Sequence, residues 1–169
     1  MNPYYFASPS TFYRLAGWLA PGFFVLAAIL AAAGLYVGFV VAPTDAQQGE
    51  VYRIIFVHVP ASWMSMFLYF VMACYCALSL TFNTRLAAMM ARAIAPTGAM
   101  FTFVALWTGS FWGRPTWGTY WVWDARITSE LVLLFLYFGF TTPIRARRAA
   151  ARSPRRGSSK ALASAMNPK

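Results

Sequence analysis

Charged side chains are scarce in this chain of 169 residues: they make up 11% of it, whereas hydrophobic residues make up 60%. So little polar surface excludes a water-soluble globule of this size, and we therefore expect an integral membrane protein. The apolar runs are long enough for helices that satisfy their own backbone hydrogen bonds inside a bilayer. The predicted fold class is all-α, a polytopic membrane helix bundle with four transmembrane helices.

Acidic residues are scarcer still, with four in the chain, and the net charge is +10. Residues 1–142 hold six arginines against these four acids, which leaves +2, so the excess charge lies in the tail. From Arg145 onward there are eight basic residues, no acid and no aromatic residue, which predicts a disordered basic tail over 144–169. Such a tail favours attraction to anionic membrane lipid, and it lacks the aromatic interleaving typical of nucleic-acid binding.

Reactive side chains are also few, because the chain has two cysteines and one histidine. Cys74 and Cys76 lie two residues apart in an apolar run, which on a helix turns their side chains about 200° apart and disfavours a disulfide between them. The sequence contains neither a C-x-x-C redox motif nor a C-x-x-C-H attachment motif. Outside the tail no nucleophile stands near a plausible base, so we expect that the protein is not an enzyme.

Four hydrophobic runs are long enough to be spans, since a helix needs about 20 residues to cross the hydrocarbon core. Proline is tolerated in the first turn of a helix and poorly in its interior, so Pro60 is expected to begin a span and Pro143 to end one. His58 then lies just outside a helix, at the water boundary. The predicted spans are 15–41, 60–82, 91–111 and 124–142, and a Trp-rich loop is predicted at 112–128.

Lysine and arginine prefer the cytoplasmic side of a membrane, and this preference predicts the orientation. With the amino terminus inside, the cytoplasmic segments carry eleven basic residues and the opposite face carries three, Arg53, Arg114 and Arg126. The amino terminus and the tail are therefore predicted to be cytoplasmic. His58 and the Trp-rich loop are predicted to share the outer face, which in a bacterial inner membrane is the periplasmic one.

Tryptophan is concentrated in one place: five of the seven tryptophans lie between Trp107 and Trp123. Anchoring at the membrane interface explains a single tryptophan, but anchors would be shared among all the helix ends. Indoles gathered beside Asp124 and Arg126 favour a planar, mostly apolar ligand that carries charged substituents at its edge. Heme is such a ligand.

The segment from Trp117 to Thr128 resembles the tryptophan-rich WWD motif of heme-handling membrane proteins. Further segments occur in family order, so the resemblance narrows to the heme exporter protein C (CcmC) family of cytochrome c maturation. It covers roughly residues 12–140. The further segments are Gln47-Gln48-Gly49-Glu50-Val51-Tyr52-Arg53-Ile54-Ile55-Phe56-Val57-His58-Val59-Pro60-Ala61, Ala95-Pro96-Thr97-Gly98, and Thr108-Gly109-Ser110-Phe111-Trp112-Gly113-Arg114-Pro115.

The resemblance implies that residues 1–143 form a transmembrane heme-handling domain. It implies that heme b binds there non-covalently and transiently, at the periplasmic face of the inner membrane. It also implies delivery of the heme to the heme chaperone CcmE, with release aided by the ABC transporter subunits CcmA and CcmB. His58 matches the first axial histidine of the family and is the expected ligand of the heme iron. The other expected heme-binding residues are Trp117, Trp121, Trp123, Asp124 and Arg126.

The three indoles of the motif are expected to form a hydrophobic shelf under the porphyrin. On a helix Trp117 and Trp121 align, whereas on an extended strand Trp121 and Trp123 do, and the sequence leaves both arrangements open. Arg126 is expected to pair with the propionates in the charge-assisted manner that suits arginine and carboxylate. Arg114 and Arg53 are further candidates for this role.

Two acidic residues flank Arg126. Asp124 is interpreted either as the N-cap of the fourth helix or as a contact that docks the heme chaperone. Glu130 is expected to pair with Arg126, because residues four apart share a helical face.

Members of the family have six spans and a second axial histidine in a later periplasmic loop, whereas four spans and a single histidine are found in this sequence. We therefore expect either a chain truncated after the fourth span or a partner chain that supplies the rest, and weaker heme retention than in a six-span relative. Two alternatives to heme delivery stay open. One is a membrane assembly subunit whose aromatic loop docks a partner protein without holding heme, and the other is an inactive truncated fragment.

Overall fold

The computed structural model describes residues 8–152, with side chains described up to residue 142, and this part of the chain is helical throughout apart from short connections. The prediction of an all-α fold is confirmed. The π-helical segment η2 (Val37–Val41) extends the first helix, and the 3-10 segment η3 (Glu50–Ile54) leads into the second. The four α-helices are α1 (Pro9–Tyr36), α2 (Ile55–Phe82), α3 (Arg85–Trp117) and α4 (Ala125–Arg152).

Three helical segments are long and apolar enough to cross a membrane: Pro9–Val41, Glu50–Phe82 and Arg85–Trp117. They contain the first three predicted spans. Helix α4 covers residues 125–142 of the fourth predicted span and is not among these three segments. The chain is a multi-pass bundle of membrane helices.

The helix boundaries differ from the prediction at the prolines. Helix α2 begins at Ile55, so the prediction that it begins at Pro60 is wrong, and His58 lies inside the helix. Pro60 is the sixth residue of α2, and a membrane helix tolerates an interior proline where neighbouring helices and side chains satisfy the freed backbone groups. Helix α4 likewise continues past Pro143 to Arg152. Most of the predicted disordered tail, residues 153–169, falls outside the described part of the chain.

The predicted Trp-rich loop is also partly helical, because α3 runs on to Trp117. Gly118 ends the helix in the left-handed conformation, with φ 78°, and its N–H donates to the carbonyl of Arg114 at 2.9 Å. Glycine adopts this conformation without steric cost, and it is the usual residue just past a helix end. The non-helical part of the loop therefore extends only from Gly118 to Asp124.

Helices α2 and α3 form an antiparallel pair joined by a tight turn in which Asn83 is left-handed, with φ 48°. The face of α3 that meets its neighbours carries small residues at intervals of about one helical turn. Small side chains let helix backbones approach closely, which is how helices pack in a membrane where the hydrophobic effect between them is weak. The buried small residues of this stripe are Ala87, Ala91, Ala95, Gly98, Ala99, Thr102 and Ala105.

Helix α4 packs on α3 through Tyr137, which is fully buried. Its ring lies over Gly98, where an added Cβ would come within 2.2 Å of the ring. Its hydroxyl donates to the backbone carbonyl of Ser65 on α2 at 2.8 Å, and its ring makes an edge-to-face contact with Tyr69 at 5.6 Å. Tyr137 thus links α4 to both α2 and α3, and these three helices form one packed group.

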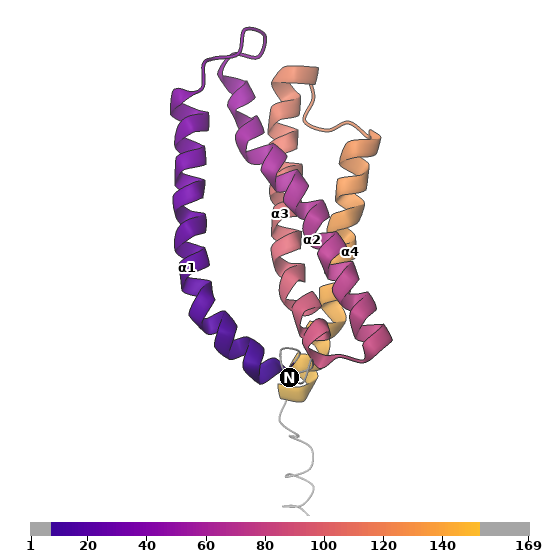
Figure 1. Cartoon of the computed structure of the whole chain (residues 1–169). Helices are drawn as coiled ribbons and strands as arrows, with labels where there is room; N and C mark the ends of the chain where they lie inside the picture. Colours follow the sequence, from indigo (N-terminus) through magenta and orange to yellow (C-terminus); the bar gives the residue numbers. More distant parts are fainter. Residues whose placement is uncertain (1–7, 153–169) are drawn as a thin grey trace, which may run out of the picture.

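Helix α1 stands apart from this group (Figure 1) and buries none of its residues. It joins the bundle at its carboxyl end, where Gly38 of η2 is buried against the ring of Phe56. The Arg53 side chain donates to the carbonyl of Gly38 at 2.9 Å and reinforces the junction.

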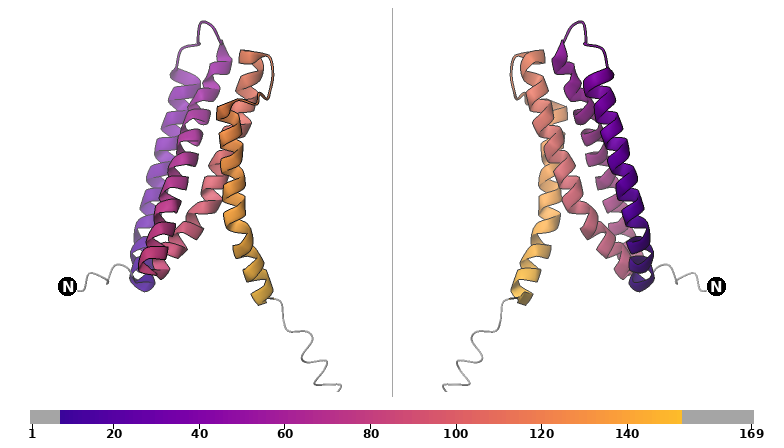
Figure 2. Two further views of the ribbon diagram at one scale, coloured as in Figure 1. Left: turned by 90° about the vertical axis from the view of Figure 1, so that its right-hand side faces the viewer. Right: turned by 90° about the vertical axis from the view of Figure 1, so that its left-hand side faces the viewer.

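Both longer connections, between α1 and α2 and between α3 and α4, lie at the same end of the bundle (Figure 1). Helix α4 starts there beside α2 and α3 and diverges from them toward Arg152 (Figure 2). His58 and the Trp-rich segment, which are far apart in the sequence, are therefore neighbours at one end of the structure.

Candidate functional site

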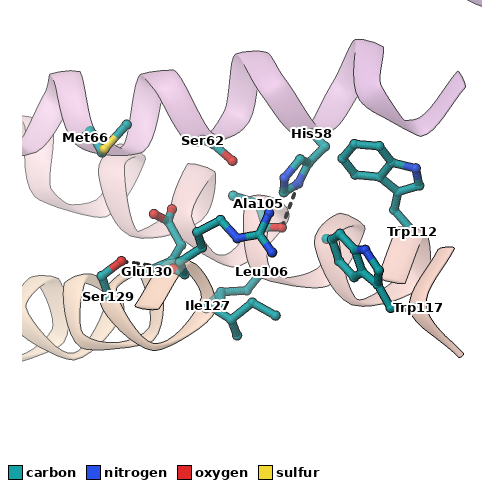
Figure 3. Close-up of a pocket in the computed structure, with 12 residues that line it drawn as sticks. His58, Ser62, Met66, Ala105, Leu106, Trp112, Trp117, Ile127, Ser129 and Glu130 are labelled. Carbon is teal, nitrogen blue, oxygen red and sulfur yellow. Dashed lines mark hydrogen bonds between the residues drawn. The ribbon is translucent and has the colours of Figure 1, made fainter. Parts of the chain in front are cut away.

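A pocket of about 340 Å³ opens between α2, α3 and α4 at the end that carries the two connections. Its size lies within the range of small-molecule sites, which is about 300–1,000 Å³. Figure 3 shows imidazole and indole rings at one end and the side chains of Met66, Ser129 and Glu130 at the other. The residues that line the pocket are His58, Ser62, Met66, Ala105, Leu106, Gly109, Trp112, Trp117, Arg126, Ile127, Ser129 and Glu130.

His58 extends from the second turn of α2 toward α3 and is partly buried. Its Nδ1 lies 3.0 Å from the carbonyl oxygen of Ala105 and 3.1 Å from the hydroxyl oxygen of Thr108 (Figure 3 draws the first contact). No hydrogen bond to Nε2 occurs within the part of the chain that the structure describes. One ring nitrogen is thus held by α3, while the other has no protein partner there.

Trp112 and Trp117 form an aromatic wall beside the imidazole. The ring centroid of Trp112 lies 5.8 Å from that of His58 and 6.2 Å from that of Trp117. The indole N–H of Trp112 donates to the side-chain oxygen of Gln48 at 2.8 Å, which ties the α1–α2 connection to α3. Gly113 lets Trp117 fold back, because a Cβ there would lie 3.3 Å from the indole.

Trp112 was not among the predicted site residues. It lies in the Gly-Ser-Phe-Trp-Gly-Arg-Pro segment that resembles the family. The available signal was its position on α3 one helical turn beyond Thr108 and Gly109, the residues that meet His58. That signal becomes visible only once α3 is known to continue to Trp117.

Arg126 lies at the mouth of the pocket, with its guanidinium carbon 5.1 Å from the centre of the Trp117 ring. Its side chain is 75% exposed and forms an ion pair with Asp124, in which Nη2 donates to Oδ2 at 2.7 Å. A guanidinium held over an aromatic face and open to solvent is suited to bind an anionic group of a ligand.

Asp124 is the N-cap of α4. Its Oδ1 accepts from the backbone N–H of Ile127 at 2.9 Å, and its carbonyl accepts from the N–H of Thr128 at 3.0 Å. The Ile127 N–H, followed by the Arg126 guanidinium, lowers the pKa of Asp124 below its ordinary value. The interpretation of Asp124 as a helix cap is confirmed, and Asp124 does not line the pocket.

The predicted pairing of Glu130 with Arg126 is wrong. Arg126 folds back onto Asp124, whereas Glu130 turns inward and its Oε1 accepts a hydrogen bond from the Ser65 hydroxyl on α2 at 2.6 Å. The helical spacing allows the predicted pair, but the cap holds the arginine, and the buried hydroxyl of Ser65 holds the glutamate. Glu130 thereby becomes part of the pocket lining, which the sequence did not indicate.

Trp121 and Trp123 lie in the non-helical segment between α3 and α4, where their rings make an edge-to-face contact at 5.4 Å. Trp121 thus pairs with Trp123, without forming a strand, and Trp117 stands on the end of α3. Trp123 is 74% exposed, and neither of the two lines the pocket. Within the described residues, the buried indole N–H of Trp121 has no hydrogen-bond partner.

The other candidate arginines are engaged elsewhere. Arg53 pairs with Glu50 and binds the carbonyl of Gly38. The guanidinium carbon of Arg114 lies 5.1 Å from the centre of the Tyr120 ring. Neither arginine lines the pocket. Of the predicted site residues, the structure thus brings together His58, Trp117 and Arg126 at the pocket, and Trp121, Trp123 and Asp124 are not part of its lining.

These features define a class of protein: a multi-pass helix bundle with an aromatic-walled pocket, one imidazole and one guanidinium at the end of its helices. The family model described as CcmC, heme exporter protein C, matches residues 3–167. The chain belongs to this family.

Curated relatives agree with the family match. The chain is 50% identical over 133 residues to heme exporter protein C of Escherichia coli strain K12, an alignment that covers 79% of this chain and 54% of the relative. It is 47% identical over 152 residues to the protein of the same name from Bradyrhizobium diazoefficiens, covering 86% and 57%. It is 52% identical over 110 residues to a ccmC-like mitochondrial protein of cytochrome c biosynthesis from Marchantia polymorpha, covering 65% and 48%. The chain spans about half the length of the curated relatives it matches.

Proposed function

We propose that this chain binds heme and takes part in its delivery for cytochrome c maturation. The observation that carries the proposal is the pocket in which His58, Trp117 and Arg126 meet. A heme requires a nitrogen ligand for its iron, apolar surface for its ring and cations for its propionates, and these three side chains supply one group of each kind. The names of the relatives, heme exporter protein C, support the same ligand.

In this proposal His58 binds the iron through Nε2, the ring nitrogen without a protein partner. The indoles of Trp112 and Trp117 pack on the porphyrin and exclude water from it. Arg126 pairs with a propionate at the mouth of the pocket, where its exposed guanidinium is reachable from outside. The proposed ligand is heme b, as the family resemblance implies, and a pocket lining without cysteine supports non-covalent binding.

The proposed location is the periplasmic face of the bacterial inner membrane, with the amino terminus on the cytoplasmic side. The distribution of lysine and arginine supports this orientation. The proposed partners are the heme chaperone CcmE, which receives the heme, and the ABC transporter subunits CcmA and CcmB. The chain would hold and pass on its cargo without making or breaking covalent bonds, so it is proposed not to be an enzyme.

Heme binding is tested with the full chain purified in detergent and titrated with heme. We expect a Soret band that His58→Ala abolishes and that imidazole restores in His58→Gly, since free imidazole then fills the vacated position. Trp63→Ala is the matched control, because Trp63 lies on the same helix, is 69% exposed and is absent from the pocket lining. A Soret band that persists unchanged in His58→Ala would contradict His58 ligation.

A second candidate function is docking of a partner protein without heme. Trp123, which is 74% exposed and pairs with Trp121 outside the pocket, favours it. Exposed tryptophans are frequent anchors of protein interfaces. If the purified chain shows no Soret band at any heme concentration and still co-purifies with CcmE in a Trp123-dependent manner, docking replaces heme binding as the function.

A further inference from the structure

We propose that Thr108 and the backbone carbonyl of Ala105 fix His58 as the tautomer that carries its proton on Nδ1. Nε2 then presents its lone pair to the pocket before any ligand arrives. Thr108 is thereby a positioning residue. Its effect on heme rests on the proposed function, whereas the tautomer itself does not.

The hydrogen-bond partners of Nδ1 determine which tautomer of His58 is present. A carbonyl oxygen can only accept, and the Ala105 carbonyl lies 3.0 Å from Nδ1. If Nδ1 carried a lone pair, two acceptors would face each other at hydrogen-bond distance inside a partly buried site, which is unfavourable. Nδ1 must therefore be the donor.

Thr108 reinforces this arrangement. The Thr108 hydroxyl has one hydrogen. It donates this hydrogen to the carbonyl of Val104, one turn back on α3, at 2.7 Å. The oxygen of Thr108 is then left to accept from Nδ1 at 3.1 Å. Two acceptors on α3 thus share the single Nδ1 proton, and the hydroxyl is oriented by the helix itself.

Gly109 allows the ring to reach these acceptors. A Cβ at this position would lie 2.9 Å from Cε1 of His58, closer than real Cβ contacts, and the obstacle is a ring attached to a packed helix. The small-residue face of α3 therefore continues into the site. Along the bundle it lets a neighbouring helix pack closely, and at Gly109 it leaves room for the imidazole ring of His58. Any side chain at position 109 would push Nδ1 away from both acceptors.

The arrangement has a chemical consequence for a metal bound at Nε2. A histidine whose other nitrogen donates to an oxygen acceptor is a more basic ligand with a fixed orientation, and loss of such a partner typically weakens metal binding about 10–100-fold. Since Thr108 is one of two acceptors, Thr108→Val is expected to weaken heme binding about tenfold, at the lower end of that range. Thr108→Ser keeps the hydroxyl and is expected to bind heme like the unchanged protein. Gly109→Ala moves the ring and is expected to weaken binding more than Thr108→Val does.

The tautomer is tested without heme. His58 is the only histidine of the sequence, so labelling histidine with ¹⁵N gives one pair of ring signals. At a pH where the imidazole is neutral, we expect Nδ1 to give the signal of a protonated nitrogen and Nε2 that of an unprotonated one. Thr108→Val is expected to shift the Nδ1 signal and Thr108→Ser to leave it in place. A protonated Nε2 in the unchanged protein would overturn the proposal. An Nδ1 signal that does not shift in Thr108→Val would overturn it as well.

Heme titration of the same variants separates this inference from the proposed function. If the unchanged chain binds heme through His58 and Thr108→Val binds it about tenfold more weakly than Thr108→Ser, positioning by Thr108 is supported. If Thr108→Val and Thr108→Ser bind heme equally well, the positioning role fails while heme binding stands. If the unchanged chain binds no heme, the proposed function fails, and the ¹⁵N signals alone decide the tautomer.

Discussion

Helix α4 meets its neighbours in two regions of opposite character. In the packed middle, defined here as Ser65, Gly98 and Tyr137, the residues are buried and the tyrosine hydroxyl has a carbonyl partner. In the pocket end, defined as His58, Trp112, Trp117 and Arg126, aromatic rings and charged groups border an open cavity.

The difference shows how one helix can serve both stability and binding. The packed middle fixes the position of α4 through close contacts that leave no space, because Tyr137 occupies the place where a side chain of Gly98 would stand. The pocket end contains a cavity instead, and its polar groups can still form interactions with a ligand. Substitutions in the packed middle should therefore change the free energy of unfolding, and substitutions in the pocket end should change ligand affinity.

The largest effect is expected for Gly98→Ala. The added Cβ would lie 2.2 Å from the Tyr137 ring, so the ring must move and α4 must shift. Overpacking of this kind lowers the free energy of unfolding by about 1–3 kcal/mol. Gly139→Ala is the control, because Gly139 is also helical and has nothing within 4 Å of its added Cβ. Denaturant unfolding in detergent micelles measures both, and equal stability of the two variants would refute the close packing.

Tyr137→Phe tests the hydrogen bond of the packed middle. It removes the donor to the Ser65 carbonyl and leaves the ring in place, so the free energy of unfolding should fall by about 0.5–1.5 kcal/mol. Heme affinity should stay unchanged, because Tyr137 does not line the pocket. Tyr36→Phe, at an exposed tyrosine of α1, is the control that should change neither quantity.

Trp117→Ala tests the pocket end. The indole contacts Trp112 and lies under the guanidinium of Arg126, but it is 47% exposed, so the fold should tolerate its loss. Aromatic contacts with a ligand contribute about 0.5–1.5 kcal/mol beyond their buried area, which corresponds to a weakening of heme affinity of about two- to tenfold. Heme titration measures the loss. A variant that unfolds more readily than Trp63→Ala would place Trp117 in the packed middle instead.

The heme affinity of the double variant Trp121→Ala, Trp123→Ala tests whether the indole shelf extends beyond the pocket. Since neither ring lines the pocket, its effect on heme affinity should be smaller than that of Trp117→Ala. An equal or larger loss of heme on purification in detergent would show that all three indoles support the porphyrin. No change at all would remove Trp121 and Trp123 from the heme site.

The smallest effect is expected from protonation of Asp124. The pKa of its carboxyl is lowered by the Ile127 N–H and by Arg126, so the cap is complete above the ordinary value of 3.8 and is lost as the pH falls through the lower folded value. The loosening should be local to the first turn of α4, and hydrogen exchange of the Ile127 amide measures it. Asp124→Asn keeps an acceptor for that amide without this titration, so its exchange protection should not depend on pH in this range.

The sequence predicted the elements better than their ends. Apolar runs of sufficient length located all four helices, because the need to bury backbone hydrogen bonds in a bilayer leaves few alternatives. The start of the second helix was misplaced at Pro60, because a membrane helix tolerates an interior proline when its surroundings satisfy the freed backbone groups. The prediction for Glu130 failed because spacing along one helix does not reveal the hydroxyl of Ser65 on another.

The amino-acid sequence by itself determined a membrane helix bundle and placed an imidazole, a set of indoles and arginines in segments that resemble one family. These follow from composition, run length and motif order, which are properties of the chain read in one dimension. Only the tertiary structure decided which of these side chains meet. Trp117 and Arg126 reach the pocket of His58 because the end of α3 and the capped start of α4 converge on α2, and contacts between helices depend on packing in three dimensions.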